Sequence, residues 1–427
     1  MIDIGVAQND ITPQQQVWLS GYGDRHSRSA DVYQTLRAGA IYLSGAIDEI
    51  IIITADLIGY GRGFSTAAKE RIAAATGLEP RQIVLTATHT HCGPHFFPMA
   101  FPGEIEVGYA DFLHERLVEV AVAARASASS GEVRFSRARS SFGINRRLPD
   151  GGGGVHFAPN PDGPIDRDLD SFWFSDASGT PIGSFTIYGC HPTSLSGYSI
   201  GGDYPGFLCR SLEAATGAPS LFATGCAGDV RPQYGSDPGE FQRPDLEAVE
   251  KAGADMAADA LAGRSNAVLL DCSQLRSVTH THQLPYGPLP RSESIEASAC
   301  GSDLNRHTWA RAMQALDELP GSCPQEIQIL QFSDAFRALF LSGEILSEIG
   351  LHLKERLAPA TTVTVAYSND LIGYVPSEAT YDLGGYEVDG GSHYYFLQPA
   401  PFTRQAERLV IDRTAEMVTS LSRGAIV

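Results

Sequence analysis

Two histidines, His89 and His91, directly follow a short apolar run at residues 83–87, in the sequence Thr-His-Thr-His-Cys-Gly-Pro. The β-branched residues of this run predict a buried strand, which Gly93-Pro94 ends. Side chains two residues apart in an extended chain point to the same side, so both imidazoles are expected to face one cavity at the strand end. Imidazole is the commonest protein ligand for zinc. The spacing therefore indicates a metal site, and the alternative is a polar turn that happens to contain two histidines.

Further polar side chains stand where other predicted strands end: Asp56, His191, Asp229, Glu344 and Tyr374. Each alone has a simple structural explanation. His191 precedes a proline and could be a hydrogen-bonded turn residue, and Glu344 could stabilise a helix N-terminus. Tyr374 could be a core tyrosine with a satisfied hydroxyl. Taken together, these positions favour one site at a common sheet edge, where α/β proteins bind their ligands.

The elements that must position these residues alternate between strands and helices. Strands are expected at 36–43, 49–54, 133–137, 171–175, 182–188, 220–223, 277–282, 338–341 and 363–367. Helices are expected at 64–76, 109–126, 204–216, 245–262, 346–357 and 404–421. The glycine-rich stretch 141–166 predicts a long loop, and 285–322 a helical insertion or flap. This alternation predicts an α/β fold, a layered mixed β-sheet with flanking helices, in a single domain spanning residues 1–427.

The bulk properties are those of a globular protein, with 43% hydrophobic and 19% charged residues among 427. The net charge of −19 argues against nucleic acid and anionic membranes as partners. No apolar run of about 18 residues appears, so no membrane span is expected. The N-terminus lacks the features of a signal peptide, and seven scattered cysteines without a CxxC motif favour reduced thiols. We therefore expect a cytoplasmic protein with a small-molecule substrate. Whether it forms a homo-oligomer is left open.

Six short motifs occur in a fixed order between Asp10-Ile11-Thr12-Pro13 and Tyr386, and thus over most of the chain. They are Thr88-His89-Thr90-His91-Cys92-Gly93-Pro94, Asn145-Arg146, His191-Pro192-Thr193-Ser194, Gly225-Cys226-Ala227-Gly228-Asp229, Gly343-Glu344 and Tyr374-Val375. In their order and spread the chain resembles the neutral/alkaline (non-lysosomal) ceramidase family, specifically its catalytic domain. The resemblance implies a neutral-ceramidase-like α/β fold and a zinc-dependent hydrolase.

The resemblance also assigns roles to individual residues. It implies that Zn²⁺ is held by His89, His191, Glu344 and Tyr374. It implies that the reacting carbonyl is contacted by His91 and Arg146, and that Tyr386 hydrogen-bonds the oxyanion. His91 or Asp229 is expected to move the proton to the leaving nitrogen. Substrate contacts are expected from Cys92, Asn145 and Arg231.

Two departures from the family concern the substrate. Arg231 occupies the position of a serine held to be essential in ceramidases, and a guanidinium stays protonated, so it is neither nucleophile nor proton shuttle. A fixed positive charge suits a substrate with a carboxylate, a phosphate or many hydroxyls. The alternative is that Arg231 turns away and pairs with Asp229 or another acid. The second departure is that the immunoglobulin-like C-terminal domain of ceramidases is missing, which makes ceramide an unexpected substrate.

The sequence therefore predicts a zinc-dependent hydrolase that cleaves an amide bond in a small polar substrate. A second hypothesis keeps the zinc but changes the bond to an ester, a lactone or a glycosidic linkage of a sugar derivative. A third is a non-catalytic relative that binds a ligand.

Overall fold

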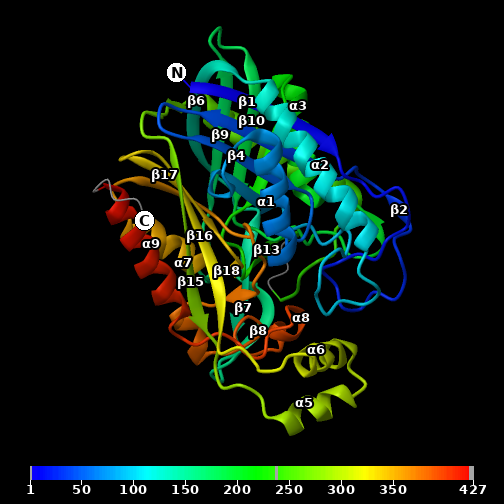
Figure 1. The fold of residues 1–427 in the computed structure, drawn as a ribbon. Helices are drawn as coiled ribbons and strands as arrows, with labels where there is room; N and C mark the ends of the chain where they lie inside the picture. Colours follow the sequence, from blue (N-terminus) through cyan, green and yellow to red (C-terminus); the bar gives the residue numbers. More distant parts are fainter. Residues whose placement is uncertain (1, 236–238, 423–427) are drawn as a thin grey trace.

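In the computed structural model, which describes residues 2–235 and 239–422, the largest sheet has nine strands (Figure 1). Eight of them lie in the order β12-β10-β9-β6-β1-β3-β4-β5, and β14 pairs with β6. The strands are β1 (Ile2–Asp10), β3 (Arg37–Ser44), β4 (Glu49–Ala55), β5 (Ile83–Ala87), β6 (Ser129–Arg139), β9 (Asp168–Asp176), β10 (Pro181–Tyr188), β12 (Ser220–Thr224) and β14 (Val268–Leu269). The pairs at the two ends, β4–β5 and β10–β12, are parallel, and the pairs between them are antiparallel.

A second, four-stranded sheet packs against one face of the first. Its order is β15 (Arg276–Pro285), β16 (Ser322–Ser333), β17 (Phe336–Leu341) and β19 (Thr361–Val365). Alternate side chains of both sheets meet in one apolar core, which includes Ile4, Phe172, Phe340 and Val365. Burying each such side chain stabilises the fold by about 1.5–3 kcal/mol, so the contact between the sheets is a main source of stability.

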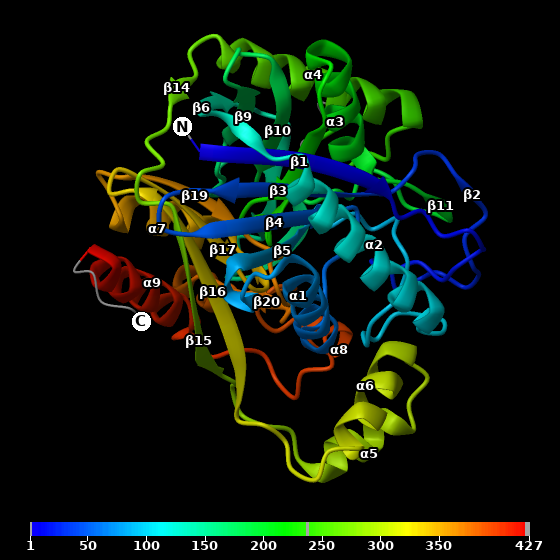
Figure 2. The same ribbon diagram turned by 45° about the horizontal axis from the view of Figure 1, so that its top comes forward.

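Helices cover the two outer faces (Figures 1 and 2). On the large sheet, α1 (Arg62–Thr76) and α2 (Val107–Ala126) lie over one half, and α3 (Asp203–Thr216) and α4 (Leu246–Arg264) over the other. On the small sheet lie α7 (Ser347–Arg356) and α9 (Ala406–Ser422). The layers therefore run helix, sheet, sheet, helix, which confirms the predicted layered α/β fold. None of the helices within the described part of the chain is long and apolar enough to cross a membrane.

The large sheet curls until its two ends meet, because the twist between neighbouring strands accumulates over many strands. The hydroxyl of Thr224, at the end of β12, donates to the carbonyl of Thr88, just after β5, at 2.6 Å. Gly39 of β3 makes this curl possible, because a Cβ there would stand 2.6 Å from Cγ of Leu221 in β12. The loops that follow the strands at both ends of the sheet are thereby brought together.

The segment after β19 fills the seam between the two ends. The backbone N–H of Asn369 donates to the carbonyl of Leu85 at 2.7 Å, and its side-chain oxygen accepts from the Leu85 N–H at 3.0 Å. The backbone N–H of Ala366 donates to the carbonyl of Thr224 at 3.1 Å. Polar side chains at the ends of β5 and β10 and after β17 therefore come to one place.

The long loop predicted at 141–166 is wrong. The stretch contains an antiparallel hairpin, β7 (Gly143–Pro149) and β8 (Val155–Asn160), and β7 also pairs with β13 (Val230–Pro232). The four glycines at 151–154 form only the turn, in which the Asp150 carboxylate accepts from the backbone N–H groups of Gly152 and Gly154. Composition alone did not separate this turn from its flanking strands.

Strand β16 was not predicted, because glutamines interrupt its apolar pattern. Gln325, Gln328 and Gln331 are buried there, and Gln328 donates to the carbonyl of Arg81 at 2.7 Å. Between β15 and β16 lie two helices, α5 (Ser292–Ala299) and α6 (Leu304–Gln314). The remaining short elements are β2 (Asp31–Val32), β11 (Ser199–Ile200), β18 (Glu344–Ile345), β20 (Tyr374–Val375), α8 (Ser392–Tyr395) and 3-10 turns at Pro80–Gln82 and Glu378–Asp382.

Candidate metal centre

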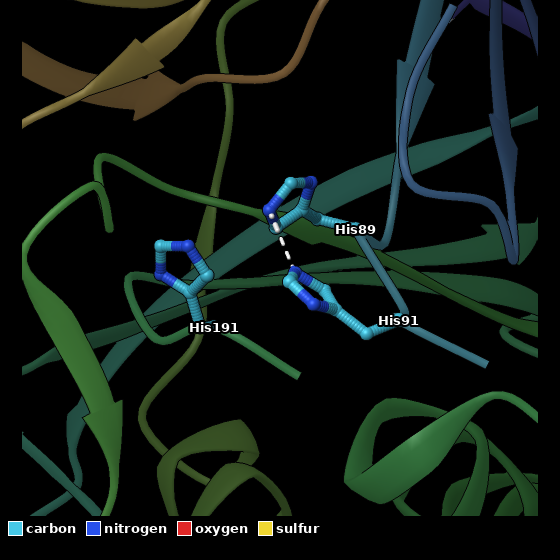
Figure 3. Close-up of side chains that lie close together, drawn as sticks. All are labelled: His89, His91 and His191. Atoms are coloured by element: carbon cyan, nitrogen blue, oxygen red, sulfur yellow. Dashed lines mark hydrogen bonds between the residues drawn. The ribbon is translucent and has the colours of Figure 1, made fainter. Parts of the chain in front are cut away.

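Three histidines converge where the ends of the large sheet meet (Figure 3). His89 and His91 follow β5, and His191 follows β10. One ring nitrogen from each lies within 4.8 Å of the others, so the three could hold a metal ion. The sequence predicted this convergence for the wrong reason, because β5 ends at Ala87 and His89 has a left-handed backbone with φ +65°. A turn, and not an extended strand, brings Nε2 of His91 to 3.3 Å from Nε2 of His89.

Backbone carbonyls fix the orientation of all three rings. Nδ1 of His89 lies 2.6 Å from the carbonyl of Ile58, and Nδ1 of His91 lies 3.0 Å from that of Gly21. Nδ1 of His191 lies 2.6 Å from the Ala227 carbonyl. A carbonyl only accepts hydrogen bonds, so each neutral ring carries its hydrogen on Nδ1 and presents a lone pair on Nε2. The protein thereby directs three Nε2 lone pairs at one another.

The carboxylate of Glu344 joins this group. Its Oε2 lies 3.0 Å from Nε2 of His191 and 3.4 Å from Nε2 of His89. Glu344 is 3% exposed, so its charge is shielded from water.

The rings of His91 and His191 stay neutral. Burial, followed by the charge of Arg146, lowers the pKa of His191 to about 4. Burial and the two neighbouring imidazoles place the pKa of His91 well below its usual range. Deprotonated imidazoles are the form that metals bind, so both rings are ready to act as ligands at neutral pH.

This donor set fits a metal ion such as zinc. Three lone pairs and a carboxylate oxygen face one another with no hydrogen between them, so these groups repel one another. A cation at their centre would be coordinated by all four and would remove this repulsion. Ligand atoms about 2.0–2.1 Å from a tetrahedral zinc ion stand roughly 3.3 Å apart. Three of the six separations among these four side chains, 3.0, 3.3 and 3.4 Å, agree with that spacing.

Tyr374 lies beside Glu344, and no hydrogen bond among the described contacts joins it to the histidines. It is the cross-strand partner of Glu344 in the short parallel pair β18–β20, and its hydroxyl accepts a hydrogen bond from Nη2 of Arg146 at 3.1 Å. The described contacts thus join His91, and not Tyr374, to His89 directly. The ligand role of Tyr374 stays a prediction.

Arg146 is held by a carboxylate that the sequence reasoning missed. Its Nε donates to Oε1 of Glu387 at 2.7 Å, and Arg147 donates to the other oxygen of the same carboxylate. A bulge in β7 between Asn145 and Arg147 accompanies this arrangement, in which two consecutive side chains reach one partner. All three charged groups are buried. Glu387 directly follows the predicted site residue Tyr386, and this adjacency was the sequence signal that could have identified Glu387.

Asn145 and Asp229 hold each other and the backbone. The carboxylate of Asp229 accepts from Nδ2 of Asn145 and from the N–H of Ser347, both at 2.8 Å. Nδ2 of Asn145 also donates to the carbonyl of Pro164 at 2.9 Å. Burial raises the pKa of Asp229. These contacts tie β7 to the start of α7, which favours a positioning role for both residues over contact with substrate or transfer of a proton.

The other predicted site residues lie around the histidines. The Cys92 thiol is buried, and burial raises its pKa to about 12. Arg231 donates to Thr193, and among the described residues it forms no ion pair with Asp229 or another acid. Tyr386 is partly exposed, and its ring centre lies 5.5 Å from that of Tyr374.

Tyr367 and Tyr22 also contact the histidines and were missed. The ring of Tyr367 lies against that of His89, with centres 4.0 Å apart, and its buried hydroxyl has no hydrogen-bond partner among the described residues. The ring of Tyr22 meets the edge of His91 at 5.1 Å. Tyr367 ends the strand predicted at 363–367, which was the available signal, whereas Tyr22 lies in no predicted strand.

Comparison with known proteins gives similarity at the level of structure. No protein-family model matches the chain, and no curated protein sequence does. The crystal structure of neutral ceramidase from Pseudomonas aeruginosa superposes with a TM-score of 0.79 at 19% identity, covering 100% of this chain and 75% of that one. A ceramidase complexed with C2 gives 0.78 at 18% identity, covering 100% and 76%. The chain therefore has the fold of the neutral ceramidases, as its motifs predicted.

Proposed function

We propose that the protein is a zinc-dependent hydrolase that cleaves an amide bond in a small polar substrate. The observation that carries the proposal is the convergence of the three histidine Nε2 atoms with the carboxylate of Glu344. The fold of the neutral ceramidases supports a hydrolase.

Zinc would be held by His89, His191 and Glu344, with His91 or Tyr374 as a further ligand. A bound zinc ion supplies a Lewis acid that acidifies water and polarises a carbonyl. If Tyr374 completes the ligand set, Nε2 of His91 keeps its lone pair and can accept the proton of the attacking water. The contact between Nδ1 of His91 and the Gly21 carbonyl holds that lone pair in place.

Arg146 and Tyr386 would stabilise negative charge on the reacting carbonyl oxygen. Glu387 fixes the guanidinium of Arg146 through Nε, and the ring of Tyr386 lies 5.6 Å from the guanidinium carbon. Donors that are already oriented need no rearrangement when the charge develops, which is the physical basis of their effect. Asn145 and Asp229 would act by holding β7, and Arg146 with it, in position.

A polar substrate is supported by the side chains that border the buried ligands. His91, Tyr22, Arg231 and Tyr386 are partly exposed there, whereas His89 and His191 are fully buried. Charged and phenolic groups would have to be desolvated to accommodate an aliphatic lipid chain. The second candidate, hydrolysis of an ester, lactone or glycosidic bond in a sugar derivative, is favoured by the aromatic rings of Tyr374 and Tyr386.

We also propose a cytoplasmic location. The cysteines are free thiols, five of them buried, a state that a reducing compartment maintains.

The proposal is tested by elemental analysis of the purified protein combined with hydrolysis assays. We expect about one zinc per chain, and turnover of N-acyl amino acids that is lost on chelation and restored by zinc. His191→Ala should lose the metal, whereas His280→Ala, which changes a partly exposed histidine of β15, should keep it. A folded protein that takes up no zinc would refute the proposal. Stoichiometric zinc without hydrolysis of amides, esters or glycosides would leave a ligand-binding role.

A further inference from the structure

Two backbone segments connect Arg231 with His191, one of the proposed metal ligands. Its Nε donates to the hydroxyl of Thr193 and its Nη2 to the Thr193 carbonyl, both at 3.2 Å. Thr193 lies two residues after His191, and the carbonyl of Val230, which precedes Arg231, lies 3.1 Å from Nδ1 of His191. The backbone that orients His191 therefore also anchors this guanidinium.

Aromatic rings hold the guanidinium by its faces. Its carbon lies 4.8 Å from the ring centre of Phe241 and 5.5 Å from that of Phe157. Phe157 also lies 5.0 Å from the guanidinium of Arg146, so one ring links the two arginines. Stacking engages the faces of a guanidinium, and Thr193 accepts from Nε and from one N–H of Nη2, so the N–H groups of Nη1 and the second N–H of Nη2 can still bind a ligand in plane. Phe157 is 51% exposed, so a ligand from solvent can reach this region.

The charge of Arg231 has no carboxylate partner within the described chain. Two described acids of this region are already occupied: Asp203 accepts from the N–H groups of Leu195 and Tyr204, and Asp229 from Asn145 and Ser347. Burial is the main cause that lowers the pKa of Arg231, and the charge of Arg146 adds to it. A partly buried cation that bonds only to neutral oxygens gains most from an anion.

We propose that Arg231 binds an oxyanion of the substrate, so that the preferred substrates are amides with a carboxylate or phosphate near the scissile bond. Arginine suits this role because its planar N–H pairs match the two oxygens of such groups. The inference rests on the proposed function and names the substrate class of the same site. Arg231 would determine specificity and take no part in bond cleavage.

The test compares matched ligands that differ only in charge. Binding to the zinc-loaded protein is measured by calorimetry for N-acetyl-, N-hexanoyl- and N-dodecanoylglycine and for the corresponding glycinamides. A second set pairs the N-acyl derivatives of phosphoethanolamine with those of ethanolamine and separates phosphate from carboxylate. In either the carboxylate set or the phosphate set, we expect the charged ligand to bind about tenfold or more tightly than its neutral counterpart, because charge-assisted hydrogen bonds are strong.

Arg231→Gln should reduce this preference to less than about threefold, and Arg231→Lys should keep only part of it because the fork is lost. Arg210→Gln is the matched control, since Arg210 is an exposed arginine that stacks on Phe207 at 5.3 Å. Zinc content and thermal unfolding establish that each variant is folded.

Equal binding of charged and neutral ligands, a preference that survives Arg231→Gln, or binding of neither would overturn the inference. Hydrolysis of the same compounds separates it from the proposed function. Tight binding of charged ligands without turnover would leave the anion site standing and reject the hydrolase. Zinc-dependent turnover of charged and neutral amides alike would support the hydrolase and reject the anion site.

Discussion

Replacing Glu344 with glutamine should remove most of the stability that zinc gives the protein and leave the metal-free protein folded. The carboxylate is the only negative charge within hydrogen-bonding distance of the described histidine cluster, 3.0 Å from His191 and 3.4 Å from His89. Glutamine keeps its volume, so no cavity forms, and the metal-free protein is relieved of a buried charge. The change therefore acts mainly on metal binding.

The magnitude follows from linkage between binding and folding. At a free zinc concentration of about 1,000 times Kd, the wild-type protein gains roughly 4.1 kcal/mol in its free energy of unfolding. Outer-shell changes weaken metal sites by about 10–100-fold, so loss of a charged ligand should weaken this one by at least roughly 100-fold. At the same zinc concentration the variant would then gain only about 1.4 kcal/mol, roughly 2.7 kcal/mol less than the wild type.

Urea unfolding with buffered zinc and with chelator measures both gains. Glu213→Gln is the matched control, because Glu213 also forms an ion pair, with Arg37 at 2.6 Å, but lies on α3 away from the histidines. If zinc stabilises the Glu344 variant as much as the wild type, the carboxylate is not a ligand and the reasoning fails.

Three further predictions concern charge and titration. Glu387→Gln leaves Arg146 and Arg147 without their shared counter-ion, so the free energy of unfolding should fall by about 3 kcal/mol, measured with urea. Burial raises the pKa of Asp56 from 3.8 to about 6, so the folded state binds this proton more tightly than the unfolded state. Stability is therefore lost as the pH rises from about 3.8 to above 6. Asp56→Asn should remove this loss of up to about 3 kcal/mol, seen by comparing unfolding at pH 4 and pH 7. The Cys92 thiol, with a pKa of about 12, should resist alkylation in the folded protein, as mass spectrometry of tryptic peptides would show.

Each of these has its own control. Glu318→Gln changes an exposed acid and should leave the unfolding free energy within about 0.5 kcal/mol of the wild type. A pH dependence that is the same in the wild type and in Asp56→Asn would show that Asp56 does not titrate differently on folding. Cys300 is exposed and should react first, so labelling of Cys92 at the same rate would contradict its burial.

The sequence predicted much of the fold because most strands are apolar runs of ordinary length bounded by turn residues. It failed at β16, where buried glutamines find partners only across the folded protein, as Gln328 does with the Arg81 carbonyl. It also failed at β7 and β8, where the glycine turn dominated the composition. At β16 the deciding contacts join residues far apart in the chain, and a local pattern does not contain them. The hairpin of β7 and β8 is local, but its strands are short and lie on both sides of the glycines.

For the site, the strand-end positions of His89, His191 and Glu344 were informative because a sheet delivers such residues to one edge. The backbone carbonyls that select the ring tautomers carried no sequence signal, since any residue type supplies a carbonyl. Glu387 was missed for a different reason. Its role depends on two arginines some 240 positions earlier, at Arg146 and Arg147, whose approach only the folded chain reveals.

The seam that closes the large sheet also bears on solubility. An open edge strand offers unpaired N–H and C=O groups to other chains and is a common starting point for aggregation. At β5, Asn369 occupies the place of a neighbouring strand, because its backbone and side chain bond both polar groups of Leu85. A substitution at Asn369 should therefore first appear as insoluble protein during expression, before any effect on chemistry could be measured.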